Sequence, residues 1–174
     1  PDPDKPGRLR TLDDPQRLSW LRLIRSENVG PATFRALVNQ FGGAEAALAA
    51  LPALSRQGGR SSISIYSHAD AEQELAAARR AGATLVAIGE PGYPPLLAEV
   101  DAPPPLLYVK GRLDLAEGPV VAIVGARNGS AIGQKFTRQL AIELGIEGFI
   151  IASGLARGID TAAHAAALER GTIA

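Results

Sequence analysis

Residues 120–160 read VVAIVGARNGSAIGQKFTRQLAIELGIEGFIIASGLARGID. This segment contains two apolar runs, Val120–Val124 and Phe149–Ala152, and each is followed by a turn of small residues that carries an arginine. Neither run alternates polar with apolar residues, so we expect two strands of a parallel sheet that is covered on both faces. The segment between them is long enough for a crossover helix, and the pattern therefore predicts a βαβ unit.

The crossover helix is expected to begin at Gly129 or Ser130. Apolar residues recur along it at steps of four, which predicts a core face made of Ile132, Phe136, Leu140 and Leu144. Another helix is expected over residues 161–168, with a third strand at 172–174. A parallel sheet that stopped there would lack neighbouring strands, so we expect the chain to be part of a longer polypeptide.

The segment before residue 82 has a helical period. Asp14 is expected to cap the first helix with Pro15 in the first helical position, and Pro52 is expected to stop a third helix over residues 44–51. A fourth helix is expected over residues 69–81. The aromatic residues of this segment lie in apolar stripes at helical spacing, which predicts that they belong to the core: Trp20, Phe34 and Phe41.

After residue 82 the spacing of the apolar residues becomes typical of strands. We expect strands over residues 84–88 and 106–109, a short helix over 96–100 between them, and a surface loop over 111–117. The predicted fold is an α/β protein with a small helical domain over residues 12–75. An incomplete Rossmann-like parallel sheet over residues 76–174 is expected to follow it.

The composition narrows the function classes. The 174 residues carry no net formal charge and include no cysteine. Zero net charge argues against a protein that coats DNA with a broadly basic surface, and the lack of thiols excludes disulfides, thiolate metal sites and a cysteine nucleophile. No apolar run reaches membrane-spanning length and no signal-peptide pattern is present, so we expect a cytoplasmic protein without a membrane partner.

The two arginine-bearing turns predict an anion site. In a parallel sheet the carboxyl ends of the strands meet at one edge, where ligands bind. The first turn is Gly125-Ala126-Arg127, and the second spans residues 153–158 with Arg157 near its end. Small residues let a backbone approach a phosphate closely, a helix N-terminus favours negative charge, and arginine can grip phosphate oxygens with its planar fork.

Individual residues of this edge have expected roles. Gly154 is expected to lie closest to a phosphate, where any side chain would displace the anion or block a positive φ. Lys135 and Arg138, beyond the first turn, extend the positive surface. A purely structural alternative pairs Arg127 and Arg157 with local carboxylates such as Asp160.

Other sites fit the sequence less well. A dinucleotide site needs the spacing G-x-G-x-x-G, but the first turn has an arginine where the second glycine should stand. A hydrolase triad can be assembled from Ser153, Asp160 and His164, but Ser153 lacks the G-x-S-x-G elbow that would present its hydroxyl. The turn Val29-Gly30-Pro31 has the character of a helix-hairpin-helix corner, which either contacts a DNA phosphate or turns the chain within a small bundle.

The motifs resemble those of the DNA-processing protein A family, also called Smf. The resemblance rests on Ile123-Val124-Gly125-Ala126-Arg127, on the run from Ser153 to Asp160, and on Gly171-Thr172-Ile173-Ala174. Upstream, Tyr93-Pro94 is similar to the lead-in of the same family. The helical N-terminus is similar to the small SAM-like domain of many members, and the remainder to the first part of their extended Rossmann domain.

This resemblance implies a function. Family members bind single-stranded DNA without sequence preference and load the RecA recombinase onto it during natural transformation. A homodimer is implied for the full-length protein, without catalysis, cofactor or metal. The residues expected to contact DNA are Gly125, Arg127, Ser130, Lys135, Ser153, Gly154, Arg157 and Gly158. The alternative of a different class is an enzyme that acts on a nucleotide or nucleoside phosphate bound at the same turns.

Overall fold

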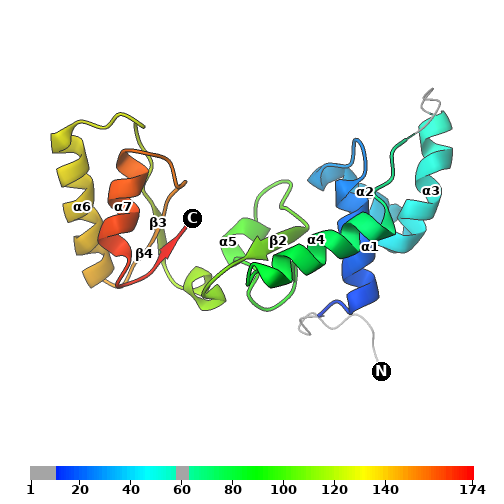
Figure 1. Cartoon of the computed structure of the whole chain (residues 1–174), viewed down its shortest axis with the longest axis horizontal. Helices are drawn as coiled ribbons and strands as arrows, with labels where there is room; N and C mark the ends of the chain where they lie inside the picture. The colour runs from blue at the N-terminus through cyan, green and yellow to red at the C-terminus, as the bar shows by residue number, and fades with distance from the viewer. Residues whose placement is uncertain (1–10, 58–62) are drawn as a thin grey trace. The chain divides into compact units, whose positions relative to one another are not determined.

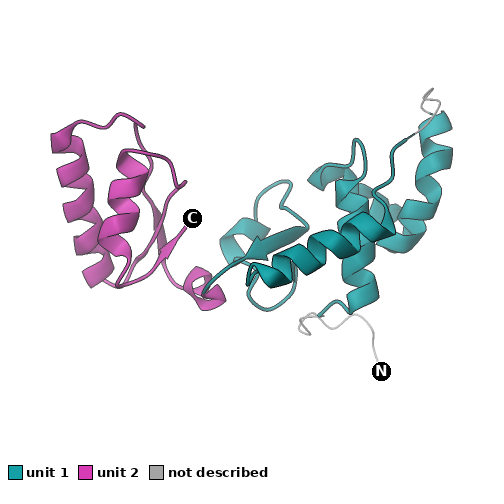
Figure 2. Ribbon diagram, viewed as in Figure 1, with its two compact units in different colours: residues 1–111 teal, residues 112–174 magenta. Residues whose placement is uncertain are grey.

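The computed structural model describes residues 11–57 and 63–174. The chain divides into two compact units, residues 1–111 and residues 112–174 (Figure 2). The helical segment belongs to the first unit together with two strands, and the parallel sheet forms the second unit. The expected domain boundary between residues 75 and 76 stays a prediction.

The described part of the first unit begins with four helices (Figure 1): α1 (Asp14–Arg25), α2 (Pro31–Phe41), α3 (Ala44–Gln57) and α4 (His68–Arg80). The residue that caps α1 is Asp13 rather than the expected Asp14, because the Asp13 carboxylate accepts a hydrogen bond from Gln16 N at 2.8 Å. The Gln16 side chain returns the bond by accepting from Asp13 N, which completes a capping box.

The expectation that Pro52 stops the third helix is wrong. Helix α3 continues through Pro52 to Gln57, although a proline inside a helix removes one hydrogen bond and costs about 3 kcal/mol. Burial on both sides of the proline offsets this cost, because Leu48 and Leu51 belong to the core and Leu54 packs against it.

The core of the helical segment forms where α1, α2 and α3 meet. Phe34 is buried in it, and Trp20 and Phe41 pack against it, as the sequence predicted. The rings of Trp20 and Phe34 meet edge to face, with centroids 5.0 Å apart. These aromatic side chains therefore stabilise the bundle.

The rest of the first unit is a short antiparallel pair of strands, β1 (Thr84–Ala87) and β2 (Leu106–Val109), with helix α5 (Pro95–Ala98) between them in sequence. A partly buried ion pair joins this part to α1, with Arg17 Nη2 at 2.6 Å from Glu90 Oε1. Glu90 also accepts the backbone N–H groups of Leu12 and Ala87, each at 2.7 Å. Three protein donors thus compensate this carboxylate for its burial, two at Oε1 and one at Oε2.

The second unit begins with the 3-10 helix η1 (Leu113–Glu117), where a loop was expected. Its other elements are β3 (Val120–Ala122), α6 (Ala131–Ile146), β4 (Ile150–Ala152), α7 (Ile159–Ala167) and β5 (Thr172–Ile173). The strands pair in the order β3-β4-β5, and both pairs are parallel, with Val121 opposite Ile151. The predicted βαβ unit is confirmed.

Both helices of this unit pack on the same face of the sheet. Right-handed crossovers between strands in sequential order require this arrangement, and α6 and α7 lie side by side in contact with β4 (Figure 1). Ile123 and Ile151 face the helices and are buried. The expectation of a sheet covered on both faces is wrong for the described residues, since Ala122 of β3 is exposed.

The predicted core face of α6 is wrong for two of its four residues. Leu140 and Leu144 pack against the core, but Ile132 and Phe136 are exposed, and Thr137 and Ala141 are buried in their place. Small residues face inwards on α6 because α7 approaches closely with small residues of its own, namely Ala163 and Ala167.

No helix in residues 11–57 or 63–174 is long and apolar enough to span a membrane.

Candidate nucleic-acid interface

The edge of the second unit at the carboxyl ends of β3 and β4 consists of two loops packed tightly against each other. Ile159 N, at the start of α7, donates to Ala126 O at 3.3 Å. A Cβ atom on Gly125 would lie 2.7 Å from Ile159 Cγ1, and one on Gly158 would collide with the carbonyl oxygens of Ala126 and Arg127. These two glycines are therefore required for contact between the loops.

Asp160 joins the two loops from within. Its side chain is buried, and its carboxylate accepts hydrogen bonds from Gly125 N at 3.3 Å, Gly154 N at 3.1 Å and Ala156 N at 3.4 Å. Backbone N–H groups that the sequence assigned to a bound phosphate thus already have an anionic acceptor belonging to the chain. The sequence signal for this role is an aspartate that follows both glycine turns, in the first turn of α7.

The backbone conformation of the second loop also differs from the expectation. Gly154 does not have a positive φ; the left-handed residues of this loop are Leu155, with φ 57°, and Gly158, with φ 84°. A Cβ atom on Gly154 would lie 3.0 Å from Asp160 Oδ2. The absence of a side chain at Gly154 thus leaves room for the internal carboxylate.

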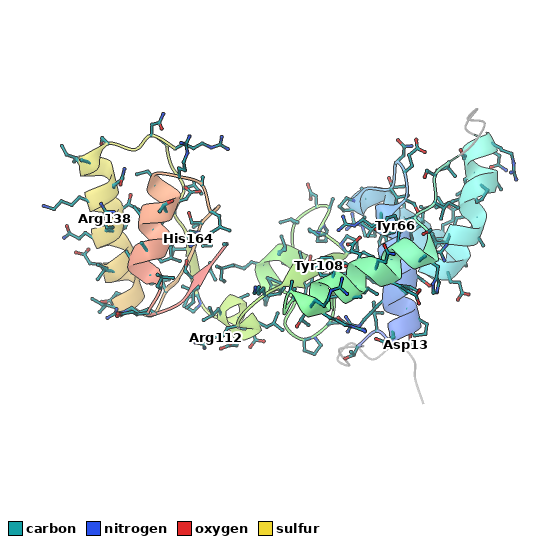
Figure 3. The ribbon with its side chains drawn as sticks, viewed as in Figure 1. Asp13, Tyr66, Tyr108, Arg112, Arg138 and His164 are labelled. Atoms are coloured by element: carbon teal, nitrogen blue, oxygen red, sulfur yellow. The ribbon has the colours of Figure 1, made fainter. Side chains whose placement is uncertain are left out.

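Arg127 and Arg157 extend from these loops into solvent. Neither guanidinium has a hydrogen-bond or ion-pair partner within residues 11–57 and 63–174, so the alternative in which they pair with Asp160 is not what the structure contains. Lys135 and Arg138 on α6 are likewise exposed and without such a partner in the described chain; Figure 3 labels Arg138. The edge therefore presents cations that no described carboxylate neutralises.

The two serines of the expected site are placed differently. Ser130 is exposed and caps α6, with its Oγ accepting from Gly133 N at 3.1 Å. Ser153 is buried, and its hydroxyl donates to Ile123 O at 2.7 Å. Ser130 is accessible to a ligand, whereas Ser153 holds the ends of the two strands together.

The residues of the hydrolase alternative are not hydrogen-bonded to one another. Asp160 and Ser153 are occupied as described above, and His164 Nδ1 lies 2.7 Å from Thr172 Oγ1. The Thr172 hydroxyl donates to Ile151 O, so His164 Nδ1 must be the donor to Thr172. His164, labelled on α7 in Figure 3, therefore ties this helix to β5. No group of three or more His, Asp and Glu side chains among the described residues is arranged to hold a metal ion.

The turn in the first unit forms a helix corner. Gly30 is the N-cap of α2 without a side-chain cap, and Pro31 is the first helical residue. Contact between this turn and DNA stays a prediction.

Known proteins resemble both parts of the chain. A family model described as DprA-like N-terminal HHH domain matches residues 14–77, and one described as DNA recombination-mediator protein A matches residues 84–174. Protein Smf of Synechocystis is 46% identical over 84 residues, which are 46% of this chain and 21% of that protein. DNA processing protein DprA of Streptococcus pneumoniae is 49% identical over 79 residues, or 45% of this chain and 28% of that protein.

DNA processing protein DprA of Bacillus subtilis is 38% identical over 96 residues, covering 55% of this chain and 32% of that protein. The solved structure of DNA processing protein A from Streptococcus pneumoniae matches with a TM-score of 0.49 and 38% identity, over 62% of this chain and 41% of that chain. The chain thus spans less than a third of the length of these three curated relatives. Since the second family model alone matches more than half of the chain, the chain belongs to the DNA recombination-mediator protein A family, whose members are named DprA or Smf.

Proposed function

We propose that this chain binds single-stranded DNA, without preference for sequence, at the edge formed by the loops after β3 and β4. One observation carries the proposal: Arg127 and Arg157 are exposed on neighbouring loops, and neither has a protein partner among the described residues. An unpaired guanidinium can bind a phosphate without first breaking an ion pair. Two of them on adjacent loops suit consecutive phosphates of one strand.

The same loops carry apolar side chains that favour a single strand as the ligand. Val124 and Leu155 are each 73% exposed, one in each loop. Single-strand sites combine cations for the backbone with side chains against which the unpaired bases pack, most often aromatic ones. A duplex hides the faces of its bases, and a free phosphate has none, so this combination supports a strand with unpaired bases.

Asp160 gives the loops their shape in this proposal and does not contact DNA. Its charge is directed at three backbone donors rather than at solvent. The DNA phosphates then depend on the arginine side chains, with Lys135 and the exposed Ser130 at the start of α6 as further contacts.

The family supports the proposal of a wider role. The relatives are named for DNA processing and the family for recombination mediation. We extend this to a cytoplasmic protein that, in its full-length form, is a homodimer and loads RecA recombinase onto incoming DNA during natural transformation. In this role it binds and positions DNA without catalysing a reaction.

The test is a titration of fluorescently labelled oligonucleotide, followed by anisotropy. Wild-type chain should bind single strands of mixed sequence with similar affinity and bind the matching duplex more weakly. Arg127→Ala and Arg157→Ala should each weaken binding, while the control Arg112→Ala should not, because Arg112 is exposed in the same unit but paired with Asp114. Equal losses for all three variants would remove the loops from the site.

The competing function, an enzyme that acts on a nucleotide or nucleoside phosphate, is tested in the same titration. Free nucleotides at millimolar concentration should fail to displace the oligonucleotide if a strand is the ligand. Displacement by one particular mononucleotide, accompanied by its conversion, would replace DNA binding with the enzymatic alternative.

A further inference from the structure

Three backbone N–H groups of the loops after β3 and β4 converge on the carboxylate of Asp160. Gly125 N donates to Asp160 Oδ1 at 3.3 Å. Gly154 N and Ala156 N donate to Asp160 Oδ2, at 3.1 Å and 3.4 Å. We call these three N–H groups the anion cradle. In nucleotide-binding α/β proteins, backbone N–H groups at this edge of a parallel sheet hold phosphates. Here the anion in the cradle belongs to the chain itself, and Asp160 is only 5% exposed.

The side chain of Ile159 fills the neighbouring space over the first loop. A Cβ atom on Gly125 would lie 2.7 Å from Ile159 Cγ1, and one on Gly129 would lie 2.9 Å from Ile159 Cδ1. In a dinucleotide site the glycines of this loop leave room for the pyrophosphate. In this chain they leave room for an isoleucine, which also packs against the core of the second unit.

A free phosphate cannot share the cradle with Asp160. The three donors are already engaged, and a phosphate bound beside them would be repelled by the carboxylate. Asp160 lies in the first turn of α7, so the helix holds its side chain in place. An internal group that is held in position competes at an effective concentration far above that of a free nucleotide in the millimolar range.

We propose that Ile159 and Asp160 form an internal plug, which occupies a nucleotide-phosphate site and thereby excludes mononucleotides and inorganic phosphate from these loops. Anions that bind at this edge must then be reached by exposed side chains, such as those of Arg127 and Arg157. The inference concerns the same loops as the proposed function, but it does not require that they bind DNA.

The first experiment asks whether an added anion can replace the missing carboxylate. Asp160→Ala leaves the three N–H groups of the cradle without their acceptor and opens space for a small anion. The matched control is Asp160→Asn, which keeps a side chain of the same size with one oxygen acceptor. Sodium formate and inorganic phosphate are titrated separately into the isotopically labelled 174-residue chain, with sodium chloride as the control for ionic strength.

The expected result is a rescue that is specific to Asp160→Ala. Formate and phosphate should shift the amide signals of Gly125, Gly154 and Ala156 in NMR spectra and slow their exchange with solvent. Both anions should bind Asp160→Ala at least about tenfold more tightly than they bind the wild type or Asp160→Asn. If Asp160→Ala is unfolded in chloride, formate or phosphate should restore its circular dichroism, because a ligand of the native state stabilises that state.

The second experiment tests the exclusion of a mononucleotide. The double variant Ile159→Ala with Asp160→Ala removes both parts of the plug, and it should bind AMP with shifts at the amides of the cradle. The wild type should show no such shifts with AMP at millimolar concentration. Ile159→Ala alone is the control, since it opens the same space but keeps the carboxylate, and it should not gain AMP binding.

Any of four results would overturn the proposal. They are a response of the cradle amides to phosphate or AMP in the wild type, an Asp160→Ala variant that neither formate nor phosphate binds or refolds, equal gains in Asp160→Ala and Asp160→Asn, and a double variant that does not bind AMP. Oligonucleotide affinity of the wild type is measured separately. A wild type that rejects AMP and also fails to bind DNA would refute the proposed function and leave the plug intact. One that binds DNA and also AMP at the cradle would do the reverse.

Discussion

Arginines of the two units differ in what their guanidinium groups contact. In the helical segment, Arg17 is bonded to Glu90 and to Leu85 O, Arg22 to Tyr66 O, and Arg25 to Glu74. At the loop edge of the second unit, Arg127 and Arg157 have no such partner in the described chain. The comparison teaches that a chain with zero net charge can still present unpaired cations at one edge, because Asp160, the carboxylate between the two loops, is directed at backbone donors instead.

Paired and unpaired arginines should also differ in what their removal does to the stability of the protein. Removing a paired, partly buried arginine leaves its carboxylate without a counterion, whereas removing an exposed unpaired one leaves nothing unsatisfied. Stability and DNA affinity should therefore respond to different arginines.

The largest effect is expected at Arg17. Its side chain is 18% exposed and that of Glu90 only 4%, so Arg17→Ala leaves a buried carboxylate without its cation. The loss in unfolding free energy should be about 3 kcal/mol. Trp20 is the only tryptophan and lies in α1, so its fluorescence during urea unfolding reports on this unit. Arg127→Ala should change the unfolding free energy by less than about 0.5 kcal/mol. Equal losses for the two variants would show that paired and unpaired arginines contribute equally to stability.

The next effect concerns Asp160. Asp160→Ala removes an anionic acceptor from three backbone N–H groups and should destabilise the loop edge by about 2 kcal/mol. Amide hydrogen exchange at Gly125 and Gly154 should accelerate by roughly thirtyfold, measured by NMR. Asp160→Asn keeps one oxygen acceptor, so its exchange rates should lie between those of the wild type and of Asp160→Ala. Unchanged protection at Gly154 in the alanine variant would show that the carboxylate does not hold this loop.

The loss of DNA-binding free energy in the arginine variants should be smaller than the loss of stability in Asp160→Ala. Arg127→Ala and Arg157→Ala should each weaken single-strand affinity by about tenfold, as expected for the loss of one charged hydrogen-bonding group. The slope of log affinity against log salt should flatten by about 0.7 for each arginine. A folded variant with lower affinity but an unchanged slope would mean that this arginine does not contact phosphate.

The smallest effect is a pH dependence in the helical segment. Burial raises the pKa of Glu74, but hydrogen bonds from Arg25, at 2.9 Å, and from Tyr66 more than offset it, so the pKa is below its usual value. The stabilisation is therefore present above the unfolded pKa of about 4.3 and is lost as pH falls through the lower folded value. Because the Arg25 side chain is 49% exposed, the contribution should stay below about 1 kcal/mol.

This pH dependence is measured as the stability difference between wild type and Glu74→Gln. The difference should be largest at neutral pH and should shrink between about pH 5 and pH 3. A difference that grows on acidification would have the wrong sign for this ion pair.

The sequence predicted the elements that carry the arginines because their signals are local. Continuous apolar runs identified β3 and β4, and of the two residues expected to begin α6, Gly129 and Ser130, Ser130 is its N-cap. Parallel pairing then followed from the length of the crossover, and it put Arg127 and Arg157 at one edge.

What the sequence did not predict depends on contacts between distant elements. Helix α6 has apolar residues on opposite sides, so periodicity alone cannot tell which side meets the sheet; the closeness of Ala163 on α7 decides it. The position of Pro52 inside α3 depends likewise on packing by Leu48 and Leu51. The sequence suggested only an ion pair or a catalytic triad for Asp160, because its three donors come from two loops that meet only in the folded chain.

The carboxylate of Asp160 should also affect the thermodynamics of DNA binding. Because it fixes both loops before any ligand arrives, the backbone at this edge is preorganised, and binding need not order it. The conformational entropy lost on association should then come mainly from the DNA and from the arginine side chains. Calorimetry should accordingly find a small heat-capacity change, unlike that of a disordered segment that folds around its target.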